Sequence, residues 1–143
     1  MEAAKILRQR GFNNFFIEAG GDVQVCRPQD YPRPWKVGIR NPFRRQEIVK
    51  VLNITNQGLA TSGSYERGDH IYNPHNPQKK IAEIISLTVV GPNIYEADRM
   101  ATAAFAMGRR GIYFIEQLPG FEAYMIDALA RATFTSGFER YVL

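Results

Sequence analysis

Residues 82–108, AEIISLTVVGPNIYEADRMATAAFAMG, contain the pattern that decides the fold. The first half is a run of β-branched and aliphatic residues that ends at Gly91 and Pro92, which is typical of a buried strand. Asn93 then stands where a helix N-cap is expected, and an alanine- and methionine-rich segment closed by Gly108 follows it. The stretch therefore predicts a buried strand followed directly by a helix.

The rest of the chain is rich in predicted strands, with the remaining helices at the start and near the end. We expect strands within residues 13–26 (two strands split by a glycine pair), 35–42, 47–55, 122–128 and 131–138, a short strand that begins at residue 58, and helices within residues 1–11 and 109–120. Strands with helices inserted late favour an α+β fold over alternating parallel β/α units. The length of 143 residues fits a single domain, residues 1–143.

The composition is that of a globular domain, with 45% hydrophobic and 22% charged residues. The formal net charge is +4, and the basic residues are scattered without interleaved aromatic residues. The sequence therefore does not predict nucleic-acid binding, although a positive field suits an anionic ligand such as a nucleotide.

Other bulk features exclude further classes. Cys26 is the sole cysteine, so an internal disulfide is excluded. No segment is long and apolar enough to predict a membrane span. The first residues, MEAAKILRQRG, are typical of a charged amphipathic helix that ends at Gly11 and not of a signal peptide, so the compartment is left open.

Two short glycine-containing segments supply candidate ligand-binding residues: Gly20, Gly21 and Asp22 in EAGGDV, and Thr61, Ser62 and Gly63 in ATSG. The glycine pair allows the backbone to approach a flat ligand, to which Asp22 can hydrogen-bond; alternatively, it forms a plain tight turn. The hydroxyl segment can present N–H and O–H donors to a phosphate or a ring carbonyl, or it is ordinary loop chemistry.

His70 lies in a long irregular segment rich in Gly, Ser, Asn and Pro, residues 64–80. Segments of this kind in compact domains are usually functional or disordered. An imidazole titrates near neutral pH, which makes His70 a candidate general base; the alternative is a surface-loop histidine.

Asp98 and Thr102 are at i and i+4 of the predicted helix, so their side chains share one face. A carboxylate and a hydroxyl are hard oxygen ligands that suit Mg²⁺ when water and substrate phosphates complete its coordination. The alternative is that Asp98 charges the first helical turn and Thr102 bonds back to a carbonyl.

In order along the chain, GGD, ATSG, HI and ADRMATAAFAMG resemble the motifs of the ApbE family, the FAD:protein FMN transferases once called thiamine-biosynthesis lipoproteins. The resemblance covers nearly the whole chain. It implies an ApbE-like, T-fold-related α+β domain with a mostly antiparallel sheet and helices packed on it. It also implies Mg²⁺-dependent transfer of FMN from FAD to a threonine of an acceptor flavoprotein.

The resemblance assigns roles to the candidate residues. Asp98 and Thr102 would bind the magnesium ion, and His70 would take the proton of the acceptor threonine. The flavin-lining residues would be Gly20, Gly21, Asp22, Thr61, Ser62 and Gly63.

The chain departs from the family pattern in two ways. The family's HI.DP.TG is here HIYNPHNPQ, so Asn73 replaces an aspartate, which we expect to weaken the orientation of this loop. The family's N-terminal portion, with its AKG segment, has no counterpart, so we expect a fragment or a truncated homologue whose missing half comes from a partner chain or a second copy. The competing reading is a non-catalytic flavin-binding or interaction module; a domain without any ligand ranks last. Relatives are often periplasmic lipoproteins.

Overall fold

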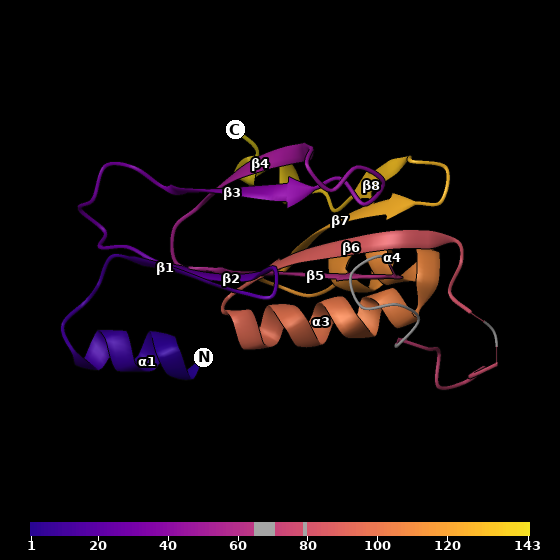
Figure 1. Cartoon of the computed structure of the whole chain (residues 1–143), viewed down its shortest axis with the longest axis horizontal. Coiled ribbons are helices and arrows are strands. Elements are labelled where there is room, and N and C mark those ends of the chain that lie inside the picture. The colour runs from indigo at the N-terminus through magenta and orange to yellow at the C-terminus, as the bar shows by residue number, and fades with distance from the viewer. Residues whose placement is uncertain (65–70, 79) are drawn as a thin grey trace.

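The computed structural model describes residues 1–64, 71–78 and 80–143 (Figure 1). Its elements are α1 (Glu2–Gln9), β1 (Phe15–Ala19), β2 (Asp22–Cys26), β3 (Trp35–Arg40), β4 (Ile48–Ile54), β5 (Gly58–Gly63), β6 (Ile84–Gly91), α3 (Ile94–Ala106), η1 (Gly108–Arg110), α4 (Gly111–Glu116), β7 (Glu122–Asp127), β8 (Ala132–Phe134) and η2 (Phe138–Tyr141). Each strand and helix predicted from the sequence has a counterpart among these elements.

The predicted C-terminal strand is shorter than expected. β8 stops at Phe134, and the chain then turns through Gly137 into η2. At Gly137 the backbone passes so close to Glu122 that a Cβ atom there would lie 2.2 Å from the Glu122 Oε1 atom. The strand pattern in the sequence cannot predict this close approach, because the approach depends on the tertiary fold.

The described residues form a six-stranded antiparallel sheet in the order β1-β2-β5-β6-β7-β8 and a separate antiparallel hairpin of β3 and β4. Figure 1 shows α3 and α4 on one face of the large sheet and the β3–β4 hairpin over the other face. The sheet is therefore the middle layer of this part of the chain. This confirms the predicted α+β fold with a mostly antiparallel sheet and helices packed on it.

The core on the helix side forms between β6 and α3, the two elements of the opening stretch. Val89 of β6 and the alanines Ala97 and Ala101 of α3 are fully buried in it. Small side chains on the inner face of α3 let the helix lie close to the sheet. At Gly58 of β5, a Cβ atom would lie 2.1 Å from the backbone nitrogen of Ile94, so only glycine fits there.

Two hydrogen bonds fix the start of α3. The Asn93 side chain accepts a hydrogen bond from the Glu96 N–H at 3.0 Å, which confirms the predicted N-cap. The Ile94 N–H donates at 2.8 Å to the Oε1 atom of Gln24, a buried side chain of β2. The first turn of α3 is therefore tied to the sheet, which sets the direction in which Asp98 and Thr102 project.

The core on the other face of the sheet forms beneath the hairpin. Val37 and Ile39 of β3 are buried in it, together with Leu52 and Ile54 of β4. Because side chains alternate along a strand, the residues between them face away from this core. The hairpin thus presents one face to this core and the other face away from it.

The helices of the described part of the chain are short. α1 is followed by its cap residue Arg10 and then by Gly11 with a φ of +85°, which confirms the predicted glycine terminator. α3 has 13 residues. None of the described helices is long and apolar enough to cross a membrane.

Candidate functional site

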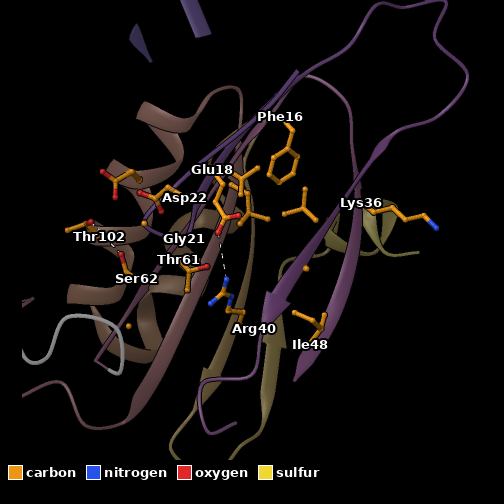
Figure 2. A pocket seen from close by; sticks show the side chains of 17 residues that line it. Phe16, Glu18, Gly21, Asp22, Lys36, Arg40, Ile48, Thr61, Ser62 and Thr102 are labelled. Carbon is orange, nitrogen blue, oxygen red and sulfur yellow. Dashed lines mark hydrogen bonds and ion pairs between the residues drawn. The ribbon is translucent and has the colours of Figure 1, made fainter. Parts of the chain in front are cut away.

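A cavity of about 520 Å³ lies between the large sheet, the β3–β4 hairpin and the outer face of α3 (Figure 2). Its wall comes from segments that are distant in the sequence. Every predicted ligand-binding and metal residue of the described part of the chain lines it: Gly20, Gly21, Asp22, Thr61, Ser62, Gly63, Asp98 and Thr102. The tertiary fold thus gathers the candidate residues of three separate motifs into one site.

The cavity opens where β2 and β5 separate. Within the described residues these strands pair at Val23–Leu59 and Gln24–Gly58, and no further pairs continue toward the β1–β2 turn. Beyond Val23–Leu59, Asp22 of β2 and Thr61 and Ser62 of β5 line the cavity. The gap between the two strands is therefore suited to a polar ligand.

The glycine pair forms the tight turn between β1 and β2. Gly20 and Gly21 have φ angles of +63° and +95°, and their neighbours Ala19 and Asp22 are paired across the hairpin. Two consecutive positive φ angles in a two-residue loop are typical of a type I′ turn, which favours glycine at both positions. The structure confirms the tight turn. The contact of these residues with a ligand stays a prediction.

Thr61 and Ser62 point to opposite faces of the sheet, although the sequence presents them as one segment. The Thr61 hydroxyl lies 2.8 Å from the Thr88 hydroxyl of β6, whereas the Ser62 hydroxyl lies 3.5 Å from the Thr102 hydroxyl of α3. The alternation of side chains along a strand explains this division. Ser62 therefore belongs to the helix side of the site, beside the predicted metal residues.

The outer face of α3 carries Asp98 and Thr102 with exposed side chains. Since Asn93 provides the N-cap, Asp98 is not needed to cap the first turn. The Asp98 carboxylate and the hydroxyls of Thr102 and Ser62 form a set of hard oxygen atoms on one wall of the cavity. This set fits Mg²⁺, which usually takes one or two carboxylates and completes its shell with water and phosphates.

No group of three or more His, Cys, Asp or Glu side chains that could hold a metal ion occurs in residues 1–64, 71–78 and 80–143. A metal on Asp98 therefore needs oxygen atoms from other sources.

No sequence motif indicated the wall that β1, β3 and β4 supply: Phe16, Glu18, Lys36, Val37, Gly38, Arg40 and Ile48. The alternation of residues in the sequence WKVGIR could have indicated part of this wall. Val37 and Ile39 are buried, and the residues that alternate with them, Lys36, Gly38 and Arg40, are exposed.

Negative charge prevails in the described part of the cavity wall. Its carboxylates belong to Glu18, Asp22 and Asp98, and its cations to Lys36 and Arg40. Figure 2 shows that the Lys36 side chain points away from the cavity, whereas Arg40 points toward Glu18. An anionic ligand therefore meets a wall in which carboxylates outnumber the inward-pointing guanidinium.

The predicted base His70 lies outside the described residues, so its role stays a prediction. Asn73, which follows it, is described. Its side-chain oxygen accepts a hydrogen bond from the His75 N–H at 2.9 Å, the pattern of an Asx turn. A carboxylate would accept the same bond, so the substitution of the family's aspartate preserves this local turn.

Comparison with known proteins identifies the class to which this fold and site belong. The model of the ApbE family matches residues 1–125. The chain therefore belongs to the ApbE family, as the order of its motifs indicates.

Individual relatives agree with this assignment. The FAD:protein FMN transferase of Klebsiella pneumoniae (strain 342) is 27% identical over 132 residues, which are 86% of this chain and 38% of that protein. The FAD:protein FMN transferase of Treponema pallidum (strain Nichols) is 30% identical over 125 residues, 79% of this chain and 34% of that protein. The chain thus spans less than two fifths of the length of these relatives.

Solved structures share the fold. The ApbE protein of Thermotoga maritima matches with a TM-score of 0.86 and 25% identity, over 98% of this chain and 48% of that one. The flavin transferase ApbE of Vibrio cholerae matches with a TM-score of 0.80 and 24% identity, over 96% of this chain and 47% of that one. The chain corresponds to about half of each of these structures.

Proposed function

We propose that the cavity binds FAD together with Mg²⁺, and that the chain takes part in transferring FMN from FAD to a threonine of an acceptor flavoprotein. The observation that carries this proposal is the gathering of three distant motifs around one cavity of about 520 Å³. The names of the relatives, FAD:protein FMN transferases, supply the reaction and its substrate.

The charge of the cavity supports a requirement for a divalent cation. The carboxylates of Glu18, Asp22 and Asp98 oppose the entry of a pyrophosphate, which is itself anionic. A divalent ion held by Asp98 and Thr102 would offset the negative charge of this wall and would supply positive charge against the phosphoanhydride. The binding of FAD is therefore expected to depend on the metal.

The remaining residues bind the ligand and handle the proton. The turn at Gly20 and Gly21 lets a flat ring approach the backbone, and Thr61 and Ser62 of β5 supply hydroxyl groups to the cavity. The acceptor threonine oxygen forms a bond to the FMN phosphorus, the bond from that phosphorus to the AMP oxygen breaks, and AMP leaves. His70 accepts the threonine proton in this scheme.

The proposal is tested with Asp98→Asn, Thr102→Val and a matched control, Glu96→Gln. Glu96 is on the same helix and pairs with Arg99 at 3.1 Å outside the cavity wall. Binding of FAD is followed by flavin fluorescence with Mg²⁺ or with a chelator, and transfer by the mass that FMN adds to an acceptor flavoprotein. We expect Asp98→Asn to abolish metal-dependent binding and transfer, Thr102→Val to weaken both, and Glu96→Gln to change neither.

The same experiment separates the competing function. A wild-type chain that binds FAD but transfers nothing to the acceptor is the non-catalytic flavin-binding module. The proposal also includes a partner chain or a second copy that completes the FAD site, in which case FAD raises the molar mass measured by light scattering. Full transfer by Asp98→Asn would refute the metal assignment.

A further inference from the structure

Arg40 is held over the cavity by a single loose contact with the described residues. One guanidinium nitrogen lies 3.7 Å from the Oε1 atom of Glu18, which is an ion pair but too long for a hydrogen bond. Both side chains are about half exposed, at 56% and 48%. The pair joins β3 of the hairpin to β1 of the large sheet across the cavity (Figure 2).

An irregularity in the hairpin lies directly beside Arg40. Ile39 pairs with Lys50, but Arg40 pairs with Ile48, so the register shifts by one residue between these two positions. Such bulges bend the strand and redirect side chains, and they are frequent next to active sites. The unmatched residue, Val49, is on β4 opposite this position, and Figure 2 shows Arg40 pointing toward Glu18 while Lys36 points away from the cavity.

We propose that Arg40 binds a phosphate group of the nucleotide and gives up its contact with Glu18 when the ligand enters. This inference rests on the proposed function, because it takes the cavity to be a nucleotide site. Glu18 is then a positioning residue that keeps the guanidinium over the empty cavity and competes with the ligand phosphate for it.

The chemistry of the two partners favours this exchange. Exposed ion pairs stabilise proteins very little because water screens both charges and two long side chains must be ordered. Arginine bound to phosphate makes parallel, charge-assisted hydrogen bonds that are among the strongest in proteins. The contact at 3.7 Å uses none of these donors in a hydrogen bond, so they are available to the ligand.

Lys36, the other cation of the described wall, is a poorer candidate. Its side chain points away from the cavity in Figure 2. Its ammonium group is a point charge without the planar fork of arginine. Arg40 is therefore the group through which the hairpin recognises an anionic ligand.

The inference is tested by titrating riboflavin, FMN and FAD into wild type, Arg40→Gln and Glu18→Gln in Mg²⁺, with flavin fluorescence as the readout. Arg40→Gln should weaken FMN and FAD about tenfold and leave riboflavin, which has no phosphate, unchanged. Glu18→Gln should tighten FMN and FAD about threefold, because the competing anion is gone. Arg40→Lys should fall between wild type and Arg40→Gln.

The matched control is Arg44→Gln. Arg44 lies in the turn of the same hairpin, pairs with Glu47 at 3.1 Å and is not part of this cavity wall. The Arg44→Gln variant removes the same charge from the same hairpin, so its affinities for riboflavin, FMN and FAD should equal those of wild type.

The sign of the Glu18→Gln effect separates recognition from a structural clasp. If the ion pair only ties β1 to β3, both variants weaken all three ligands alike, and the inference is overturned. An equal loss of riboflavin affinity in Arg40→Gln also overturns it, because Arg40 would then contact the ring. A wild-type chain that binds none of the ligands refutes the proposed function, and the inference with it; normal binding by wild type and Arg40→Gln alike refutes the inference alone.

Discussion

The packing of α3 against β5 yields a sharp prediction for Gly58→Ala. The added methyl group would lie 2.1 Å from the Ile94 nitrogen and 2.3 Å from the Asn93 carbonyl carbon, both of them backbone atoms. An ordinary van der Waals contact is at least 3.4 Å, so the start of α3 must move by about 1.3 Å. No rotamer change can relieve a clash with backbone, so the helix itself shifts.

The magnitude follows from two losses. Overpacking of this kind costs about 1–3 kcal/mol. Moving Ile94 also disrupts its hydrogen bond to the buried Gln24 side chain, which adds about 1 kcal/mol. A total near 3 kcal/mol is a large share of the roughly 5–15 kcal/mol that holds a domain together. For a chain of this length it corresponds to a fall of roughly 6–12 °C in Tm.

Urea unfolding followed by circular dichroism measures this cost, and Gly11→Ala provides the control. Gly11 has a φ of +85° with no atom within 4 Å of the added methyl, so its alanine variant carries backbone strain without a clash. We expect Gly11→Ala to cost about 1 kcal/mol. Because the shift of α3 displaces Asp98 from β5, Gly58→Ala should also weaken metal-dependent FAD binding, whereas Gly11→Ala should not.

Two results would refute this reasoning. A free energy of unfolding for Gly58→Ala within about 1 kcal/mol of wild type, with an unchanged urea slope, would mean that α3 adjusts freely. Equal losses in Gly58→Ala and Gly11→Ala would mean that the clash contributes nothing beyond ordinary backbone strain.

Further predictions concern the helix cap and two titrating groups. Asn93→Ala should lower the free energy of unfolding by about 1 kcal/mol, measured in urea, because the Glu96 N–H loses its acceptor. The backbone N–H of Arg131, foremost among its hydrogen-bond donors, holds the pKa of Asp127 below its usual value. The Asp127 carboxylate therefore stabilises the fold above its unfolded pKa and loses this effect as pH falls, so the difference between wild type and Asp127→Asn should shrink below about pH 4 in unfolding experiments. Burial raises the pKa of the Tyr124 phenol, so its contribution is present below the usual pKa and lost as pH rises; tyrosinate absorbance should show a late-titrating component that Tyr124→Phe removes.

The unit of β6 and α3 could be predicted because its signals are local. A long apolar run, a capping asparagine and a glycine stop act within a few residues of one another, and the structure has both elements and the cap. The shared face of Asp98 and Thr102 follows from helical periodicity in the same way. That Asp98 and Thr102 share a site with the glycine turn could be predicted only from the order of the motifs. That order indicates the family and says nothing about the distances between residues.

The hairpin wall could not be predicted from local signals alone. The alternation in β3 identifies Lys36, Gly38 and Arg40 as one face, but an exposed strand face usually meets water. The packing of the hairpin over the large sheet, after a proline-rich connection, brings β3 to the cavity, where the buried Val37 lines it together with these exposed residues. The opposite directions of Thr61 and Ser62 likewise appear only when the strand is placed between two layers.

The short pairing between β2 and β5 affects how firmly the β1–β2 hairpin is held in the sheet. The β1–β2 hairpin is joined to β5 at Val23–Leu59 and Gln24–Gly58, and its glycine turn lies beyond the last of these pairs. A ligand that bridges the two strands would brace the turn end of the β1–β2 hairpin. Amide exchange at Gly20 and Gly21 should therefore slow in proportion to ligand occupancy, so that the exchange rate of the turn measures how far the cavity is filled.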